Sequence, residues 1–183
     1  MLAEKGKGLK AGSKIIDFQL QGVDGKKHST KEFENKKVLA IIFTCNHCPY
    51  AQAYQDRIIN LQKEFGDKGL QIIAINSNDS TDYPDDSFEN MVKRSKEKKF
   101  NFPYLHDESQ IFGRAFGAQV TPDCFVFDEK RTLQYRGRID DNWQNPEIAN
   151  THDLKNAIIN LLSGKKPSVQ EASAIGCSIK WRQ

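Results

Sequence analysis

The sequence lacks a long hydrophobic run and carries little net charge. No apolar stretch approaches the roughly 20 residues that a membrane-spanning helix needs, so we expect no membrane partner. The formal net charge is only +3, and residues 1–14 supply it with four lysines against Glu4, so we expect no nucleic-acid partner. The same segment has no apolar core of the kind that a signal peptide requires, which favours a cytoplasmic location.

Cysteine is also scarce, with four in 183 residues. In a reducing compartment, so few cysteines argue against a framework of structural disulfides and for redox or metal chemistry. The sequence contains no internal repeat, no low-complexity tract and no motif for a bound cofactor. The four cysteines are Cys45, Cys48, Cys124 and Cys177.

What is present describes one domain with two tails. Hydrophobic residues make up 38% of the chain and charged residues 28%, which is typical of an ordinary globular protein. We expect a flexible N-terminal arm at residues 1–14, a single domain at 15–164 and a C-terminal tail at 165–183. Residues 175–181 are too apolar for a free end, so we expect the tail to dock back on the domain.

The hydrophobic pattern of the domain predicts an α/β fold. Residues 38–43 are continuously apolar, as in a strand that is buried on both faces. Apolar residues then recur at Ile58, Leu61 and Phe65, which is the spacing of one helix face. A second apolar run at 70–75 completes a strand, helix and strand unit in which the two strands are parallel.

The remaining elements surround this unit. Residues 17–21 alternate like a half-buried strand, and Asp24-Gly25 turns the chain into a hairpin ahead of the main sheet. A helix is expected to start at Asp86, with Glu89 three residues on as in a capping box. We therefore predict a central mixed β-sheet flanked by helices, preceded by a hairpin and followed by a tail. The other predicted elements are a polar loop at 76–86, a connector at 100–109, a short helix at 110–116, a strand at 120–128, an antiparallel strand at 132–139 and a last helix at 151–164.

The chemistry is expected at Cys45 and Cys48, a Cys-x-x-Cys pair between the first buried strand and the first helix. Unpaired backbone N–H groups and the helix dipole favour an anion at this position, so a thiolate is stabilised relative to a thiol. Two cysteines at this spacing can close to a disulfide with little backbone movement, which gives a reversible two-electron switch. The alternatives are a buried structural pair and a metal half-site with Cys45, His47, Cys48 and Cys177 as ligands.

Four further residues are candidates for supporting roles. His47 could stabilise the Cys45 thiolate as an imidazolium neighbour and lower its pKa, or it could be a solvent-facing loop residue. The Thr121–Pro122 bond is a candidate for the cis conformation. Cys124 is expected to be an inert buried thiol. Cys177, on a tail expected to be mobile, is either a resolving thiol or a bystander, and His28, His106 and His152 are expected to be surface or loop residues.

These features together resemble the thioredoxin superfamily, and specifically its peroxiredoxin-like redoxin branch, which groups with alkyl hydroperoxide reductase and thiol-specific antioxidant proteins. The resemblance covers residues 15–162 and implies a thioredoxin-like fold in which a cis Pro122 packs against the dithiol. The matching pieces are Asp17-Phe18-x-Leu20 with Asp24-Gly25, Cys45-Asn46-His47-Cys48-Pro49 after a strand, Asp107 before a short helix, Thr121-Pro122, Phe125-Val126-Phe127-Asp128 leading to Tyr135-x-Gly137, and the closing Gly176-Cys177-Ser178-Ile179-Lys180-Trp181.

The departures from this family bear on the reaction. If Cys48 is aligned with the peroxidatic cysteine, Ile41 stands at the position of the family's proline, Cys45 at that of its threonine and Pro122 at that of its arginine. The groups that polarise a peroxide are then missing, and a thiolate lacks donors for the departing oxygen.

The sequence therefore predicts a thiol-disulfide oxidoreductase with an antioxidant role and no cofactor. Cys45 is expected to attack a disulfide, Cys48 to resolve the mixed disulfide, His47 to tune the thiolate and Pro122 to shape the substrate groove. The expected partners are a protein or small-molecule disulfide and a thioredoxin- or glutathione-type electron donor. The alternatives are a peroxidase with Cys48 peroxidatic and, outside the enzymes, a metal-binding or redox-sensing module.

Overall fold

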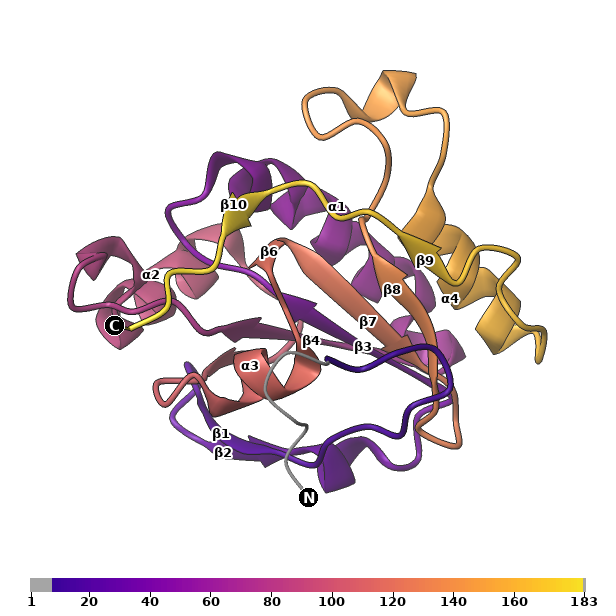
Figure 1. Ribbon diagram of the computed structural model, residues 1–183, viewed down its shortest axis with the longest axis horizontal. Coiled ribbons are helices and arrows are strands. Elements are labelled where there is room, and N and C mark those ends of the chain that lie inside the picture. The colour runs from indigo at the N-terminus through magenta and orange to yellow at the C-terminus, as the bar shows by residue number, and fades with distance from the viewer. Residues whose placement is uncertain (1–7, 183) are drawn as a thin grey trace.

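The computed structural model describes residues 8–182, and residues 1–7 of the predicted arm lie outside the described residues. A mixed eight-stranded sheet crosses the molecule in the order β2-β1-β5-β4-β3-β7-β8-β9, and β10 pairs with β6 beside it (Figure 1). No helix in the described part of the chain is long and apolar enough to cross a membrane. The strands are β1 (Gln19–Gly22), β2 (Lys27–Ser29), β3 (Val38–Phe43), β4 (Leu70–Asn76), β5 (Tyr104–His106), β6 (Val120–Thr121), β7 (Asp123–Phe127), β8 (Leu133–Gly137), β9 (Glu171–Ala172) and β10 (Cys177–Ser178).

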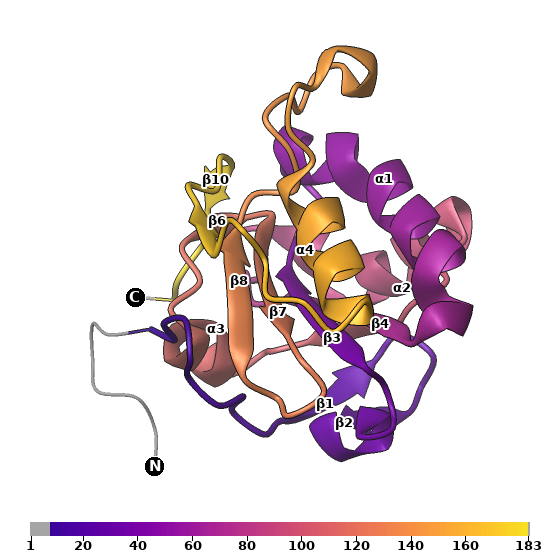
Figure 2. The same ribbon diagram turned by 90° about the vertical axis from the view of Figure 1, so that its right-hand side faces the viewer.

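Helices cover both faces of the sheet, as Figure 2 shows. Every residue of β3 is buried, because alternate side chains enter two different cores. Val38, Ala40 and Ile42 belong to the core beneath α1 (Pro49–Phe65), α2 (Phe88–Lys98) and α4 (Asp153–Leu162). Leu39, Ile41 and Phe43 belong to the core on the face of α3 (Ile111–Phe116). The predicted α/β class with a mixed sheet is thereby confirmed.

The predicted unit around the cysteines is also confirmed. Strands β3 and β4 are parallel, with Val38 opposite Leu70. Helix α1 connects them, and its predicted inner face, which includes Ile58, Leu61 and Phe65, is buried. The carboxyl ends of β3 and β4 therefore lie at the same edge of the sheet, and the loops that follow them meet there.

Two predictions, one about the hairpin and one about the start of α2, are wrong. The hairpin β1–β2 is part of the main sheet, because β1 pairs with β5 in the segment that was predicted to be a connector. Helix α2 starts at Phe88 rather than at Asp86, because the Ser87 side chain is the N-cap and accepts a hydrogen bond from the backbone N–H of Asn90. Asp86 instead lies in a short 3-10 turn and is fully buried.

Both ends of the described chain are held on the domain. The predicted flexibility of the arm is wrong for residues 9–14, since Leu9 is buried and the backbone N–H of Gly12 donates to the carbonyl of Leu133. In the tail, β9 lies parallel to β8, and β10 lies antiparallel to β6 with Cys177 opposite Thr121. The last strand therefore reaches the loop edge where the cysteines lie (Figure 1).

Replacing Gly137 with alanine is expected to loosen the tail and lower the free energy of unfolding by about 1–3 kcal/mol. Gly137 has φ +133°, and an added Cβ would collide with the backbone carbonyl of Ala172 in β9. Urea unfolding measures the loss. Gly25→Ala is the control, because Gly25 also has positive φ (+83°) but an added Cβ there would meet nothing within 4 Å. Equal losses in the free energy of unfolding of Gly137→Ala and Gly25→Ala would contradict the role of Gly137 in the packing of β9 against β8.

Candidate active site

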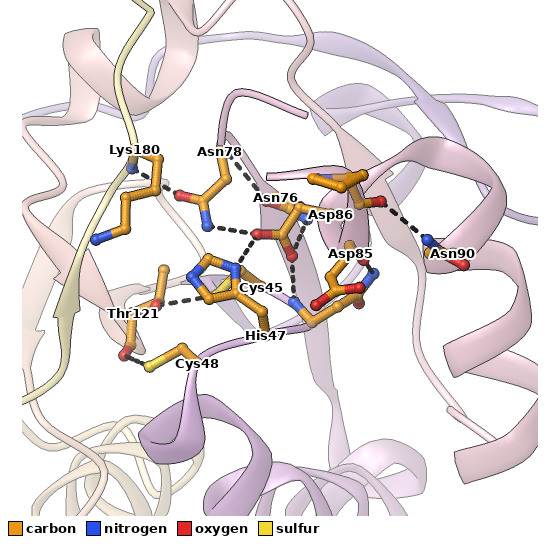
Figure 3. A network of polar contacts seen from close by, with 12 residues as sticks. Cys45, His47, Cys48, Asn76, Asn78, Asp85, Asp86, Asn90, Thr121 and Lys180 are labelled. Carbon is orange, nitrogen blue, oxygen red and sulfur yellow. Dashed lines mark hydrogen bonds and ion pairs between the residues drawn. The ribbon is translucent and has the colours of Figure 1, made fainter. Parts of the chain in front are cut away.

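Cys45 and Cys48 lie where the chain leaves β3 and enters α1 (Figure 3). Cys48 is the N-cap of α1 and Pro49 its first residue, which suits proline because that position needs no N–H donor. Ala51 in the first turn packs against both cysteines. Both sulfurs are shielded from solvent, with relative exposures of 1% for Cys45 and 0% for Cys48.

Thr121 contacts both sulfurs from across the sheet edge. Its Oγ1 lies 3.2 Å from the Cys45 sulfur, and its carbonyl accepts a hydrogen bond of 3.2 Å from the Cys48 thiol (Figure 3). The following peptide bond, Thr121–Pro122, is cis, as predicted. Pro122 itself is buried, and it separates β6 from β7 in what the sequence predicted as one strand.

The two thiols titrate as a pair that shares protons. The pKa of Cys48 is lowered because its sulfur accepts hydrogen bonds from the Cys45 thiol, the Cys177 thiol and the N–H of Ala51. The pKa of Cys45 is raised by that same hydrogen bond to Cys48, by burial and by the negative charge of Asp86. The pKa that is lowered at the helix end is therefore that of Cys48, whereas the prediction of a lowered pKa for Cys45 is wrong, because its own neighbours raise it.

His47 is directed toward a carboxylate. Its Nδ1 lies 2.5 Å from Oδ2 of Asp86, and no hydrogen bond joins its ring to either sulfur in the described part of the chain (Figure 3). The ring is partly exposed and stacks on Tyr83, with centroids 5.3 Å apart and an interplanar angle of 14°. The Lys180 ammonium lies 5.5 Å from the centre of the Tyr83 ring. His47 and Tyr83 thus form the exposed rim of the site, and any effect of His47 on Cys45 passes through Asp86.

Asp86 is the functional candidate that sequence reasoning missed. Its carboxylate is completely buried and accepts hydrogen bonds from the backbone N–H of Asn46 at 2.6 Å and from the amides of Asn76 at 3.3 Å and Asn78 at 2.8 Å. Asn76 is the last residue of buried strand β4, and Asn78 lies in the polar segment that directly follows it. Polar residues at the end of this second buried strand were the signal in the sequence for further site residues, because the carboxyl end of β4 lies beside that of β3.

The remaining cysteines differ in their surroundings. Cys177 is partly buried in β10, where it packs against the cluster of Cys45, Cys48 and Ala51. Cys124 is fully buried in β7, where burial raises the pKa of its thiol well above the ordinary value. The structure therefore brings three of the four sulfurs together and leaves Cys124 in the core.

A cation could be held by Cys45, His47 and Asp86. One ligand atom of each residue, a sulfur, a nitrogen and an oxygen, lies within 4.8 Å of the other two. The predicted half-site, which included Cys48 and Cys177, therefore differs from the group that the fold assembles. Mixed sulfur, nitrogen and oxygen donors of this kind suit Zn²⁺, and three protein ligands leave a fourth position open.

The reduced protein is expected to form its first thiolate well below the ordinary cysteine pKa of about 8.5. Because the pKa of Cys48 is lowered, its thiolate persists as the pH falls and is lost only below that lowered pKa. Ultraviolet thiolate absorbance against pH measures the transition. In Cys48→Ser the transition at low pH should disappear, whereas Cys124→Ser should retain it. A first transition at the ordinary cysteine pKa would contradict the lowered pKa.

The comparisons with known proteins agree with this architecture. Residues 10–158 match the Redoxin family. The crystal structure of an uncharacterized conserved protein from Geobacillus kaustophilus has a TM-score of 0.89 at 37% identity, covering 94% of this chain and 93% of that one. That of peroxidoxin BcpB from Mycobacterium tuberculosis has a TM-score of 0.65 at 18% identity, covering 85% of this chain and 97% of that one, and this likeness concerns the fold alone.

A curated relative carries a name that describes chemistry. Thiol-disulfide oxidoreductase ResA from Halalkalibacterium halodurans is 25% identical over 120 residues, which cover 66% of this chain and 64% of the relative. The chain thus matches less than two thirds of that protein's length. The family match covers most of the domain, and the fold carries the Cys-x-x-Cys pair and cis proline that the sequence resemblance implied. This chain therefore belongs to the Redoxin family, and its fold is thioredoxin-like.

Proposed function

We propose that this protein is a thiol-disulfide oxidoreductase in which Cys45 and Cys48 alternate between a dithiol and a disulfide. The observation that carries the proposal is that the two cysteines pack together at the N-terminus of α1, where the pKa of the Cys48 thiol is lowered. A thiolate at ambient pH is the reactive form in disulfide exchange. The name of the ResA relative supports the same chemistry.

The reaction begins at Cys45, on the side of the site where His47 and Tyr83 are partly open to solvent. The Cys45 thiol passes its proton to the Cys48 thiolate across their hydrogen bond. The Cys45 sulfur then attacks one sulfur of a substrate disulfide, and the other leaves as a thiolate that takes up a proton. Cys48, once it has lost its proton, attacks the Cys45 sulfur, releases the second substrate thiol and leaves a Cys45–Cys48 disulfide.

His47 and Asp86 act as positioning residues in this scheme. Asp86 fixes the loop between the two cysteines through the backbone N–H of Asn46 and the ring of His47. Its charge also holds the proton on Cys45 until a substrate arrives, because a carboxylate close to a sulfur disfavours a second negative charge. Pro122, next to Thr121, shapes the groove in which a substrate disulfide approaches.

The substrate class is a protein or small-molecule disulfide, and the electron donor is a thioredoxin- or glutathione-type thiol of a cytoplasmic pool. In that direction the protein would reduce disulfides and have an antioxidant role. Reduction of insulin disulfides with glutathione as donor tests this activity. The wild type should accelerate the reaction and Cys45→Ser should not, whereas Cys124→Ser should retain the wild-type rate. Equal rates with and without protein would overturn the proposal.

Peroxide reduction has less support. No arginine or lysine hydrogen bonds to the sulfur of Cys45 or Cys48 among residues 8–182, so a departing oxygen would find no cationic donor there. Rapid consumption of hydrogen peroxide in a stopped-flow assay would restore this alternative.

A metal-binding or sensing role is the second candidate, and the cluster of Cys45, His47 and Asp86 favours it. Binding of a cation there would displace the proton from Cys45 and separate His47 from Asp86. Titration of the reduced protein with Co²⁺ tests the site, because a cobalt-thiolate bond gives an intense ultraviolet absorption. His47→Ala should abolish that band if the site exists, and its absence in the wild type would exclude this candidate.

A further inference from the structure

The segment that carries Cys177 is fixed in place on both sides. In β10, Cys177 pairs with Thr121, and the backbone N–H of Ile179 donates to the carbonyl of Gln119 at 3.0 Å. The N–H of Lys180 donates to Oδ1 of Asn78 at 2.8 Å, and its carbonyl accepts from the N–H of Asp79 at 2.8 Å. The expectation that this tail is mobile is therefore wrong for the residues around Cys177, because hydrogen bonds to β6, Asn78 and Asp79 hold them. Figure 3 shows the bond between Lys180 and Asn78.

The preceding glycine permits the close approach of the tail. An added Cβ on Gly176 would collide with the carbonyl oxygen of Thr121, the same oxygen that accepts the hydrogen bond from Cys48. Glycine at this position lets the tail backbone lie directly against the backbone that contacts the dithiol. A larger residue would push Cys177 away from Cys48.

The three sulfurs form a series from the interior to the surface. Cys177 packs against the buried cluster that Cys45 and Cys48 form with Ala51. Cys45 and Cys48 are buried, whereas Cys177 is partly exposed. An electron donor that approaches from solvent therefore has better access to Cys177 than to either member of the Cys-x-x-Cys pair.

We infer that Cys177 is a third redox-active sulfur, which exchanges with the Cys45–Cys48 disulfide and transfers it to the surface. This inference rests on the proposed function, which supplies that disulfide. The Cys177 sulfur attacks Cys48, the Cys48–Cys177 bond forms, and the Cys45–Cys48 bond breaks. Cys45 leaves as a thiolate and takes up the proton that Cys177 has lost, so no outside oxidant or reductant is needed. A thiol of the glutathione- or thioredoxin-type donor then attacks the more exposed Cys177 sulfur, and Cys48 leaves as a thiolate that takes up a proton. A second donor thiol attacks the donor sulfur of this mixed disulfide, which releases Cys177 and leaves the donor as a disulfide.

The charges near Cys177 change in the direction that this step requires. In the dithiol state, burial, the hydrogen bond to Cys48 and the negative charge of Cys48 together raise the pKa of Cys177 to about 11. When Cys48 is part of a disulfide, its sulfur carries no negative charge and no longer accepts a hydrogen bond from the Cys177 thiol. Of the three causes that raise the pKa of Cys177, only burial then remains. Cys177 thus becomes easier to deprotonate once the disulfide has formed.

The first test isolates the two sulfurs in the Cys45→Ser/Cys124→Ser variant of the full chain. After equilibration with a mixture of reduced and oxidised glutathione, peptide mass mapping should find an intramolecular Cys48–Cys177 disulfide. Adding Gly176→Val should reduce the equilibrium constant for this disulfide by about tenfold or more, because the tail no longer holds the thiols at high effective concentration. Recovery of Cys48 only as a mixed disulfide with glutathione, with Cys177 free, would overturn the inference.

The second test measures turnover and separates this inference from the proposed function. Cys177→Ser should still reduce a stoichiometric amount of substrate disulfide to completion, but its re-reduction by glutathione should slow by about tenfold relative to the wild type. Unchanged re-reduction would count against the role of Cys177. A wild type that fails to reduce insulin while the Cys48–Cys177 disulfide still forms would instead count against the proposed function.

Discussion

Cys48→Ser is expected to hold a mixed disulfide on Cys45 and to lower the rate of disulfide turnover by about a thousandfold or more. The Cys45 sulfur can still attack a substrate, because the change removes the Cys48 charge that raises the pKa of Cys45 and leaves Thr121 Oγ1 3.2 Å away as a hydrogen-bond partner. The serine hydroxyl cannot attack the resulting mixed disulfide, so the substrate stays attached. Incubation with a disulfide peptide followed by intact-protein mass spectrometry measures the adduct, and peptide mapping locates it.

Cys45→Ser is the matched variant, and it should form little adduct. In the proposed mechanism Cys48 accepts the proton of Cys45, and Cys45 is the attacking sulfur because it lies beside the partly exposed His47 ring. An adduct on Cys48 in Cys45→Ser, with none on Cys45 in Cys48→Ser, would reverse the two roles. That outcome would follow if Cys48, the cysteine with the lowered pKa, is also the sulfur that attacks the substrate.

Asp86→Ala is expected to lower the free energy of unfolding by about 3–5 kcal/mol. The change removes a fully buried carboxylate and leaves the backbone N–H of Asn46 and the amides of Asn76 and Asn78 without their acceptor. Urea unfolding measures the loss. Asp85→Ala is the control, because the Asp85 side chain is exposed and only its carbonyl accepts from Asn46, so that change should stay within about 0.5 kcal/mol.

A substitution at Asp86 should also change the reactivity of Cys45. Asp86→Asn keeps the size of the side chain and removes the negative charge that raises the pKa of Cys45. Alkylation of the reduced protein by iodoacetamide, followed across pH and mapped by peptide, should therefore show Cys45 reacting at lower pH than in the wild type. An unchanged profile for Cys45, or equal losses of stability in Asp86→Ala and Asp85→Ala, would show that Asp86 is not coupled to the dithiol.

The parts of this protein that depend on neighbouring residues were predictable from the sequence. The apolar run at 38–43 and the helical spacing of Ile58, Leu61 and Phe65 place the cysteines at a strand end and a helix start, and β3 and α1 occur there. Thr121–Pro122 was predicted as a cis bond from two adjacent residues. Such features follow from periodicity and local stereochemistry, which a short window of sequence records.

The errors concern contacts between distant segments. Asp86 was assigned to a helix cap, because an acidic residue with a glutamate three positions later is a local signal for a helix start. Ser87 takes that role, and Asp86 meets His47 across 39 positions of sequence. Residues 104–106 carried too short a pattern to predict a strand, and their pairing partners lie in β1 and β4.

The sequence by itself determined that a Cys-x-x-Cys pair sits at the end of a buried strand in an α/β domain. Only the tertiary structure decided what surrounds that pair. Thr121 reaches Cys45 across 76 positions of sequence, and Cys177 reaches Cys48 from the last strand of the chain. Local spacing of residue types encodes each helix and strand, but sheet pairing and burial determine which elements contact one another. The pKa values of the sulfurs depend on those tertiary contacts.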